Sequence, residues 1–84
     1  MIEFDEEKSS KNLRERGFDF AYAARIFDGT VTTWDSTRGG EQRFKSTGII
    51  DGKFYTVIYT WRRGNRRIIS ARRARRQEIE DYGL

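Results

Sequence analysis

The sequence predicts an α+β fold in which two N-terminal helices pack on a four-stranded, mostly antiparallel sheet, with a short C-terminal helix. Apolar residues recur with a helical period before residue 29 and with the two-residue period of strands after it. Helices grouped beside strands, rather than alternating with them, are typical of α+β proteins and not of doubly wound sheets. The 84 residues are expected to form one domain, 1–84.

The first helix is predicted by its two ends. Asp5 is a suitable N-cap, and Gly17 is a suitable left-handed residue just after the last turn. Arg14 and Arg16 in that last turn complement the helix dipole. Apart from Leu13 the segment has almost no apolar residues, so this helix is expected on the surface.

Two further helices are predicted from periodicity and helix-forming residues. The second spans 20–27, is capped by Asp19, and carries one buried stripe made of Phe20, Ala23, Ala24 and Phe27. The third spans 74–82, has Ile79 as its clearest apolar anchor, and ends at Gly83.

Four strands are predicted by runs of β-branched and aromatic residues, at 30–34, 42–50, 54–61 and 66–73. A flexible loop at 35–40 joins the first two, and Asp51-Gly52 is the strongest hairpin signal in the chain. The third strand has apolar residues on both faces, as expected for a central strand.

The composition excludes several chemistries. The chain has no cysteine and no histidine, which removes disulfides, thiolate zinc sites, iron–sulfur clusters, a cysteine nucleophile and a histidine base. We expect no cofactor and no metal; any metal would need oxygen ligands, which favour magnesium or calcium. No apolar run approaches the ~20 residues of a membrane span. The acidic N-terminus is unlike an export signal, so a cytoplasmic location without membrane contact is expected.

The positive charge is concentrated in the second half of the chain. Residues 1–42 hold 6 Lys/Arg and 9 Asp/Glu, whereas residues 43–84 hold 11 and 4, within an overall net charge of +4. Eight arginines and no acid lie between residues 62 and 76: Arg62, Arg63, Arg66, Arg67, Arg72, Arg73, Arg75 and Arg76. A solvated surface is one interpretation, but a single-sign arginine run favours a polyanionic partner: nucleic acid first, an acidic protein second.

Strand alternation predicts how the basic side chains divide between the faces of the sheet. Arg43 and Lys45 are two residues apart and should project from one face. Arg72 and Arg73 are consecutive, so one of them must point away from the other. If Arg43 and Lys45 face solvent, the sheet offers several cations to a phosphate.

Aromatic side chains near these cations are candidates for stacking on bases. Trp34 and Tyr82 are the stronger candidates. Trp61 ends a hydrophobic strand and is expected in the core more than at a stacking site.

A histidine-free site can still cleave RNA, because RNA supplies its own 2′-OH nucleophile. Cleavage then depends on positioning, charge stabilisation and modest proton transfer. Glu41 is a candidate base, and Lys45 or Tyr82 could assist proton transfer. The alternative interpretation of Glu41 is a surface acid paired with Arg43 or Arg38.

The string from Arg67 to Glu78, followed by Tyr82, resembles the C-terminal signature of the BrnT family of type II toxin–antitoxin toxins. Further similarities lie at 4–5, 11–13, 17–20, 23–24, 26–28 and 41–44, and at Gly48, so the resemblance covers nearly the whole chain. One departure is Arg16, where many relatives have a histidine; a histidine-dependent mechanism is excluded.

The resemblance implies a compact RelE-like ribonuclease that inhibits translation by cutting RNA, including ribosome-bound mRNA, without metal. It also implies a BrnA-like antitoxin with a ribbon-helix-helix part, and contact with operator DNA only through that antitoxin. The candidate catalytic residues are Glu41, Arg43, Arg72, Arg73 and Tyr82. The candidate RNA contacts are Trp34, Lys45, Arg62, Arg63, Arg66, Arg67, Arg75 and Arg76.

The alternative function is a non-catalytic basic module that binds RNA or the antitoxin and acts as a co-repressor. RNA retained without cleavage products would support it. The antitoxin could bring acidic residues to the arginine run at 62–76, or could pack on an apolar face of the first two helices.

Overall fold

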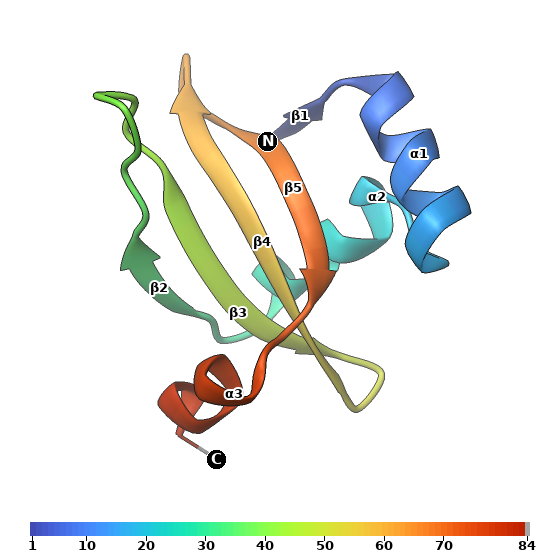
Figure 1. The fold of residues 1–84 in the computed structure, drawn as a ribbon, viewed down its shortest axis with the longest axis vertical. Coiled ribbons are helices and arrows are strands. Elements are labelled where there is room, and N and C mark those ends of the chain that lie inside the picture. The colour runs from blue at the N-terminus through green and yellow to red at the C-terminus, as the bar shows by residue number, and fades with distance from the viewer. Residues whose placement is uncertain (84) are drawn as a thin grey trace.

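The computed structural model describes residues 1–83 and contains a five-stranded sheet in the order β1-β5-β4-β3-β2 (Figure 1). β1 runs parallel to β5, and every other neighbouring pair is antiparallel. The elements are β1 (Ile2–Phe4), α1 (Glu6–Arg16), α2 (Phe20–Ala23), the 3₁₀ helix η1 (Ala24–Asp28), β2 (Thr32–Asp35), β3 (Phe44–Ile50), β4 (Lys53–Arg62), β5 (Asn65–Arg73) and α3 (Arg76–Tyr82). The predicted α+β class is confirmed.

The prediction of four strands is wrong by one, because β1 was missed. Ile2 lies opposite Arg66 and Phe4 opposite Ile68, so a three-residue segment forms a parallel edge strand. Its partner is more than sixty residues away in sequence, and three residues are too few to show alternation. The sheet is therefore mixed, and the four predicted strands all occur within two residues of their expected bounds.

The predicted helix 20–27 is two shorter helices. Asp19 caps α2 as expected, accepting a hydrogen bond from the Tyr22 backbone N–H at 2.8 Å. The chain then tightens into η1, where three residues complete a turn. The buried stripe accordingly has a period of three: Phe20, Ala23 and Ile26 are buried, while Ala24 and Phe27, predicted in the stripe, are only partly buried.

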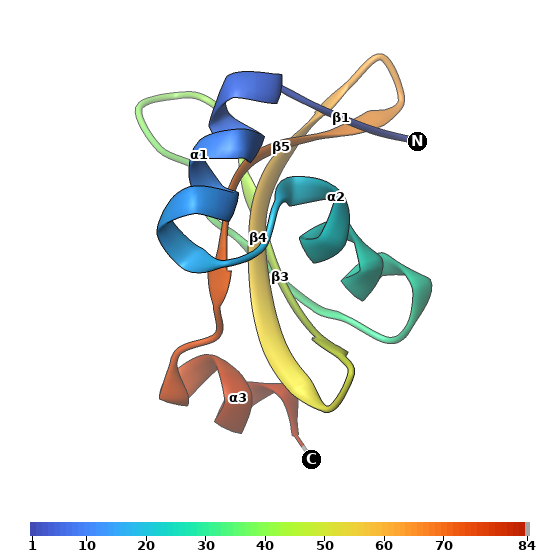
Figure 2. The ribbon, with the colours of Figure 1, turned by 90° about the vertical axis from the view of Figure 1, so that its right-hand side faces the viewer.

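α1 is a surface helix, as predicted, and lies on the side of the sheet formed by β1 and β5 (Figures 1 and 2). Its buried residues are the polar Ser9 and Asn12. Ser9 accepts a hydrogen bond from the Phe20 N–H at 3.0 Å, and Asn12 donates one to the Phe18 carbonyl at 2.8 Å. Leu13 is half exposed, so α1 is attached largely by polar contacts.

α2 and η1 cover one face of the sheet (Figure 2). The hydrophobic core lies between these two helices and the sheet. Gly48 in β3 permits the close approach of η1, because a Cβ at this position would lie 2.8 Å from the Ile26 Cβ. The expectation that Trp61 belongs to the core is wrong: this residue lies near the end of β4 and is 48 % exposed.

α3 packs at the lower end of the opposite face (Figure 2). Its buried residue is Glu78, whereas the predicted anchor Ile79 is only partly buried. α3 covers Thr47 and Thr56, which are fully buried beneath it. The part of this face that α3 leaves open carries the candidate site. Among residues 1–83, no helix is long and apolar enough to cross a membrane.

Candidate functional site

The open face of the sheet carries a groove of about 560 Å³. Its walls come from the end of α1, the loop after β2, the strands β3 to β5 and the segment before α3. Six of the ten lining residues are cations, and no carboxylate of the described chain is among them. The lining residues are Arg16, Ser36, Thr37, Arg38, Arg43, Lys45, Ile58, Ser70, Arg72 and Arg75.

Strand register explains why the sheet cations gather here. Lys45 lies opposite Ile58, which in turn lies opposite Ser70, so the three side chains form one row across the face. Arg72 is two residues beyond Ser70 and shares its face, and Arg43 shares the face of Lys45. The predicted alignment of Arg43 and Lys45 is confirmed.

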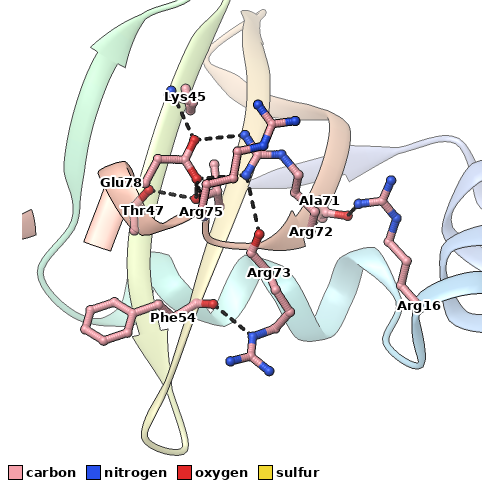
Figure 3. Close-up of polar contacts among 10 residues, drawn as sticks. Arg16, Lys45, Thr47, Phe54, Ala71, Arg72, Arg73, Arg75 and Glu78 are labelled. Atoms are coloured by element: carbon pink, nitrogen blue, oxygen red, sulfur yellow. Dashed lines mark hydrogen bonds and ion pairs between the residues drawn. The ribbon is translucent and has the colours of Figure 1, made fainter. Parts of the chain in front are cut away.

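A buried carboxylate lies behind this groove (Figure 3). The Arg72 Nη1 and Nη2 atoms donate to the two oxygens of Glu78 at 2.8 Å each, a bidentate ion pair. The Lys45 Nζ lies 3.0 Å from Glu78 Oε2. Thr56 Oγ1 at 2.9 Å and the Arg75 N–H at 2.8 Å donate to Oε1.

These contacts lower the pKa of the Glu78 carboxyl far below its usual value. The Arg72 hydrogen bonds are the largest cause, while burial acts in the opposite direction. The Arg75 N–H, Lys45 and Thr56 add to the lowering. Glu78 is therefore an anion at neutral pH, its two oxygens are already occupied by donors, and it is a poor proton acceptor.

Arg73 points to the other face of the sheet, as alternation requires. Its Nε donates to the Phe54 carbonyl at 3.1 Å, and its guanidinium lies 5.2 Å from the centre of the Tyr55 ring. It lines a separate hollow of about 550 Å³ beside α1 and α2. The structure thus separates the two adjacent arginines that were both candidate catalytic residues.

Glu41 and Tyr82 lie outside the set of groove-lining residues. Glu41 accepts a hydrogen bond from Arg43 Nε at 3.0 Å. This ion pair is the one expected if Glu41 is a surface acid. The Tyr82 hydroxyl donates to the Thr30 carbonyl at 2.9 Å, and its ring packs against Phe54. Glu41 is thus linked to the groove by its ion pair with Arg43, which lines it. Tyr82 instead connects α3 to the segment before β2.

Trp34 is near the groove and contacts one of its cations. Lys45 Nζ lies 5.1 Å from the centre of the Trp34 ring, and the two residues are cross-strand neighbours. The indole makes a cation–π contact with Lys45. It is half-buried, so part of its surface is open to solvent.

The arginine run does not form one surface. Its members Arg72 and Arg75 line the groove, whereas Arg66 stacks against the Phe27 ring at 4.1 Å on the face that carries α2 and η1. Arg67 forms an ion pair with Glu3 at 3.5 Å. Arg73 lines the second hollow, and the other three members are exposed: Arg62 and Arg63 at the β4–β5 turn, and Arg76 at the start of α3.

Sequence reasoning missed Glu78 and two groove cations. Glu78 had a recognisable signal, since it is the first acid after the arginine run and occupies the third position of α3. Arg16 and Arg38 come from a helix end and a loop far apart in sequence, so no local pattern joins them to the strand cations. Arg16 Nη1 also lies 3.5 Å from the Ala71 carbonyl at the β5 edge (Figure 3).

A groove lined by six cations on a small mixed sheet is typical of proteins that bind polyanions. Residues 4–78 match the family model described as "Ribonuclease toxin, BrnT, of type II toxin-antitoxin system", and the chain belongs to this family. It is thus a ribonuclease toxin with RNA as substrate and an antitoxin as partner. No curated protein sequence matches the chain.

Proposed function

We propose that the cation-lined groove is the site of RNA cleavage and that the reaction needs no metal ion. The observation that carries the proposal is the convergence of six cations from several elements on one groove without a lining carboxylate among residues 1–83. Such a surface attracts the RNA backbone and stabilises additional negative charge on a phosphate.

The proposed reaction uses the ribose of the substrate. The 2′-oxygen attacks the adjacent phosphorus, loses its proton to a base, and the bond from phosphorus to the 5′-oxygen breaks. The leaving 5′-oxygen takes up a proton, and the products are a 2′,3′-cyclic phosphate and a 5′-hydroxyl. The protein's largest contributions are alignment and preset positive charge.

Arg43, Lys45 and Arg72 are proposed to contact the phosphate that reacts, and Arg75 a neighbouring one. These four share the groove, and arginine forks suit the paired oxygens of a phosphate. Glu41 is the proposed base, because its ion pair with Arg43 holds a carboxylate beside a groove that otherwise presents cations.

The wider biological setting follows the family. We propose that the partner is a BrnA-like ribbon-helix-helix antitoxin, that operator DNA is reached only through it, that the fold is RelE-like, and that the toxin acts in a bacterial cytoplasm. The second hollow and the groove both offer cations to an acidic antitoxin segment.

The test compares Arg43→Gln and Arg75→Gln with Arg14→Gln, which removes the same charge from an exposed position on α1. Cleavage of a defined RNA is followed in buffer containing EDTA. We expect about a 10²-fold loss of kcat for Arg43→Gln, a smaller loss for Arg75→Gln, and wild-type rates for Arg14→Gln. Equal rates for all three variants would remove the groove as the site, and RNA retained without products would favour the non-catalytic alternative.

A further inference from the structure

We infer that Glu78 is a positioning residue of the cleavage site, which fixes the Arg72 guanidinium and the Lys45 ammonium together in the groove before RNA arrives. The inference rests on the proposed function, because it assigns a role within the same groove. It differs from that function in naming a residue that does not touch the substrate.

The burial and contacts of Glu78 indicate that it acts through its neighbours. Its side chain is 5 % exposed, and it is not among the residues that line the groove. Each carboxylate oxygen already accepts two or three hydrogen bonds or ion-pair contacts. No lone pair is left for a substrate hydroxyl, so its effect must pass through Arg72 and Lys45.

Arg72 and Lys45 need such a partner. Both have long flexible stems and like charges, so side-chain entropy and mutual repulsion oppose placing them side by side. A carboxylate shared by both offsets the repulsion and sets the plane of the guanidinium. Lys45 has three N–H donors and Arg72 has five, so both keep donors for a phosphate after binding Glu78.

The same carboxylate couples the groove to the placement of α3. Glu78, in the first turn of α3, accepts hydrogen bonds from the N–H of the N-cap residue Arg75 and from the Thr56 hydroxyl of β4, so one side chain joins helix, sheet and site (Figure 3). In the opposite role, Glu78 would compete with RNA for Arg72 and Lys45. The buried bidentate geometry favours positioning, and the two roles predict opposite changes in activity.

The experiment measures kcat and KM for a defined RNA with the Glu78→Gln variant, using Glu80→Gln as the matched control. Glu80 lies on the same helix, is exposed, and pairs with Arg76 one turn away at 3.6 Å. Glutamine has nearly the same shape but is neutral, and its NH2 group replaces one of the two oxygens that accept from Arg72, so a donor there meets a donor. We expect kcat to fall about 10²-fold with KM changed less than about 3-fold, and Glu80→Gln to match the wild type.

Thr56→Val provides a second variant that keeps the carboxylate. It removes one donor to Glu78 from a fully buried position outside the groove and nearly preserves volume. We expect a loss of kcat of about 3- to 10-fold, in the same direction as Glu78→Gln. Circular dichroism at the assay temperature establishes that each variant is folded.

Rates are measured with EDTA and again with Mg²⁺. A wild-type toxin that cleaves only with Mg²⁺ would overturn the metal-free reaction but leave the comparison of variants intact. Equal kcat for Glu78→Gln and Glu80→Gln would overturn the positioning role. Faster cleavage with a lower KM in Glu78→Gln would overturn it too, because Glu78 would then compete with RNA.

Discussion

Replacing Glu78 by glutamine should also destabilise the fold. Removing one partner of a buried ion pair costs about 3–5 kcal/mol when the other charge stays buried. The Arg72 and Lys45 side chains are 14 % and 29 % exposed, so water can partly solvate them after the change. We therefore expect the lower end, about 3 kcal/mol, which for a domain of this size lowers Tm by about 12–24 °C. The exposed pair of Glu80 should contribute less than about 0.5 kcal/mol.

The effect of Glu78 should depend on pH in a defined direction. Because folding lowers the pKa of this carboxyl, its stabilisation is complete above the pKa of the unfolded chain, about 4.5. It is lost as pH falls below that value toward the lowered pKa of the folded state. Thermal unfolding followed by circular dichroism should give a constant Tm difference between wild type and Glu78→Gln from pH 5 to pH 8, and a smaller one at pH 3. A Tm difference like that of Glu80→Gln, or one that grows in acid, would refute this reasoning.

Two other substitutions test the packing around the site. Gly48→Ala should cost about 1–3 kcal/mol, because its Cβ would meet the Ile26 Cβ at 2.8 Å, whereas Gly29→Ala meets open space and should change the Tm little. A Tm of Gly48→Ala equal to that of Gly29→Ala would show that η1 does not pack as described. Arg66→Met should cost about 1–2 kcal/mol in urea unfolding, because the Arg66 guanidinium lies within 6 Å of three aromatic ring centres; an unchanged midpoint would show that these contacts do not stabilise the fold.

Local patterns predicted most of the fold. The caps at Asp5 and Asp19, the reversal at Asp51-Gly52 and the alternation along the strands each depend on neighbours within a few residues, and each was confirmed. β1 could not be predicted in this way, because its pairing partner is remote and its three residues show no period. The split at η1 was missed because periods of 3 and 3.6 residues are nearly indistinguishable over two turns.

The site was predictable as far as the alternation of side chains along a strand determines which face of the sheet each one occupies. That rule placed Arg43 with Lys45 and separated Arg72 from Arg73. It could not say that α3 buries Glu78 against Arg72, because a glutamate in a short amphipathic helix is usually solvated. Arg16 was assigned to a helix end, and its reach to the groove depends on how α1 lies along the sheet edge.

The central claim is that the groove cleaves RNA with the substrate's own 2′-OH and without metal. The most direct measurement incubates the purified toxin, in EDTA, with an RNA that it cuts at one position and with the same RNA carrying a single 2′-deoxyribose immediately 5′ of that phosphate. We expect a 2′,3′-cyclic phosphate product from the first RNA and no cleavage at that position in the second. Cleavage of the deoxy substrate at that phosphate, or cleavage that requires added Mg²⁺, would contradict the account.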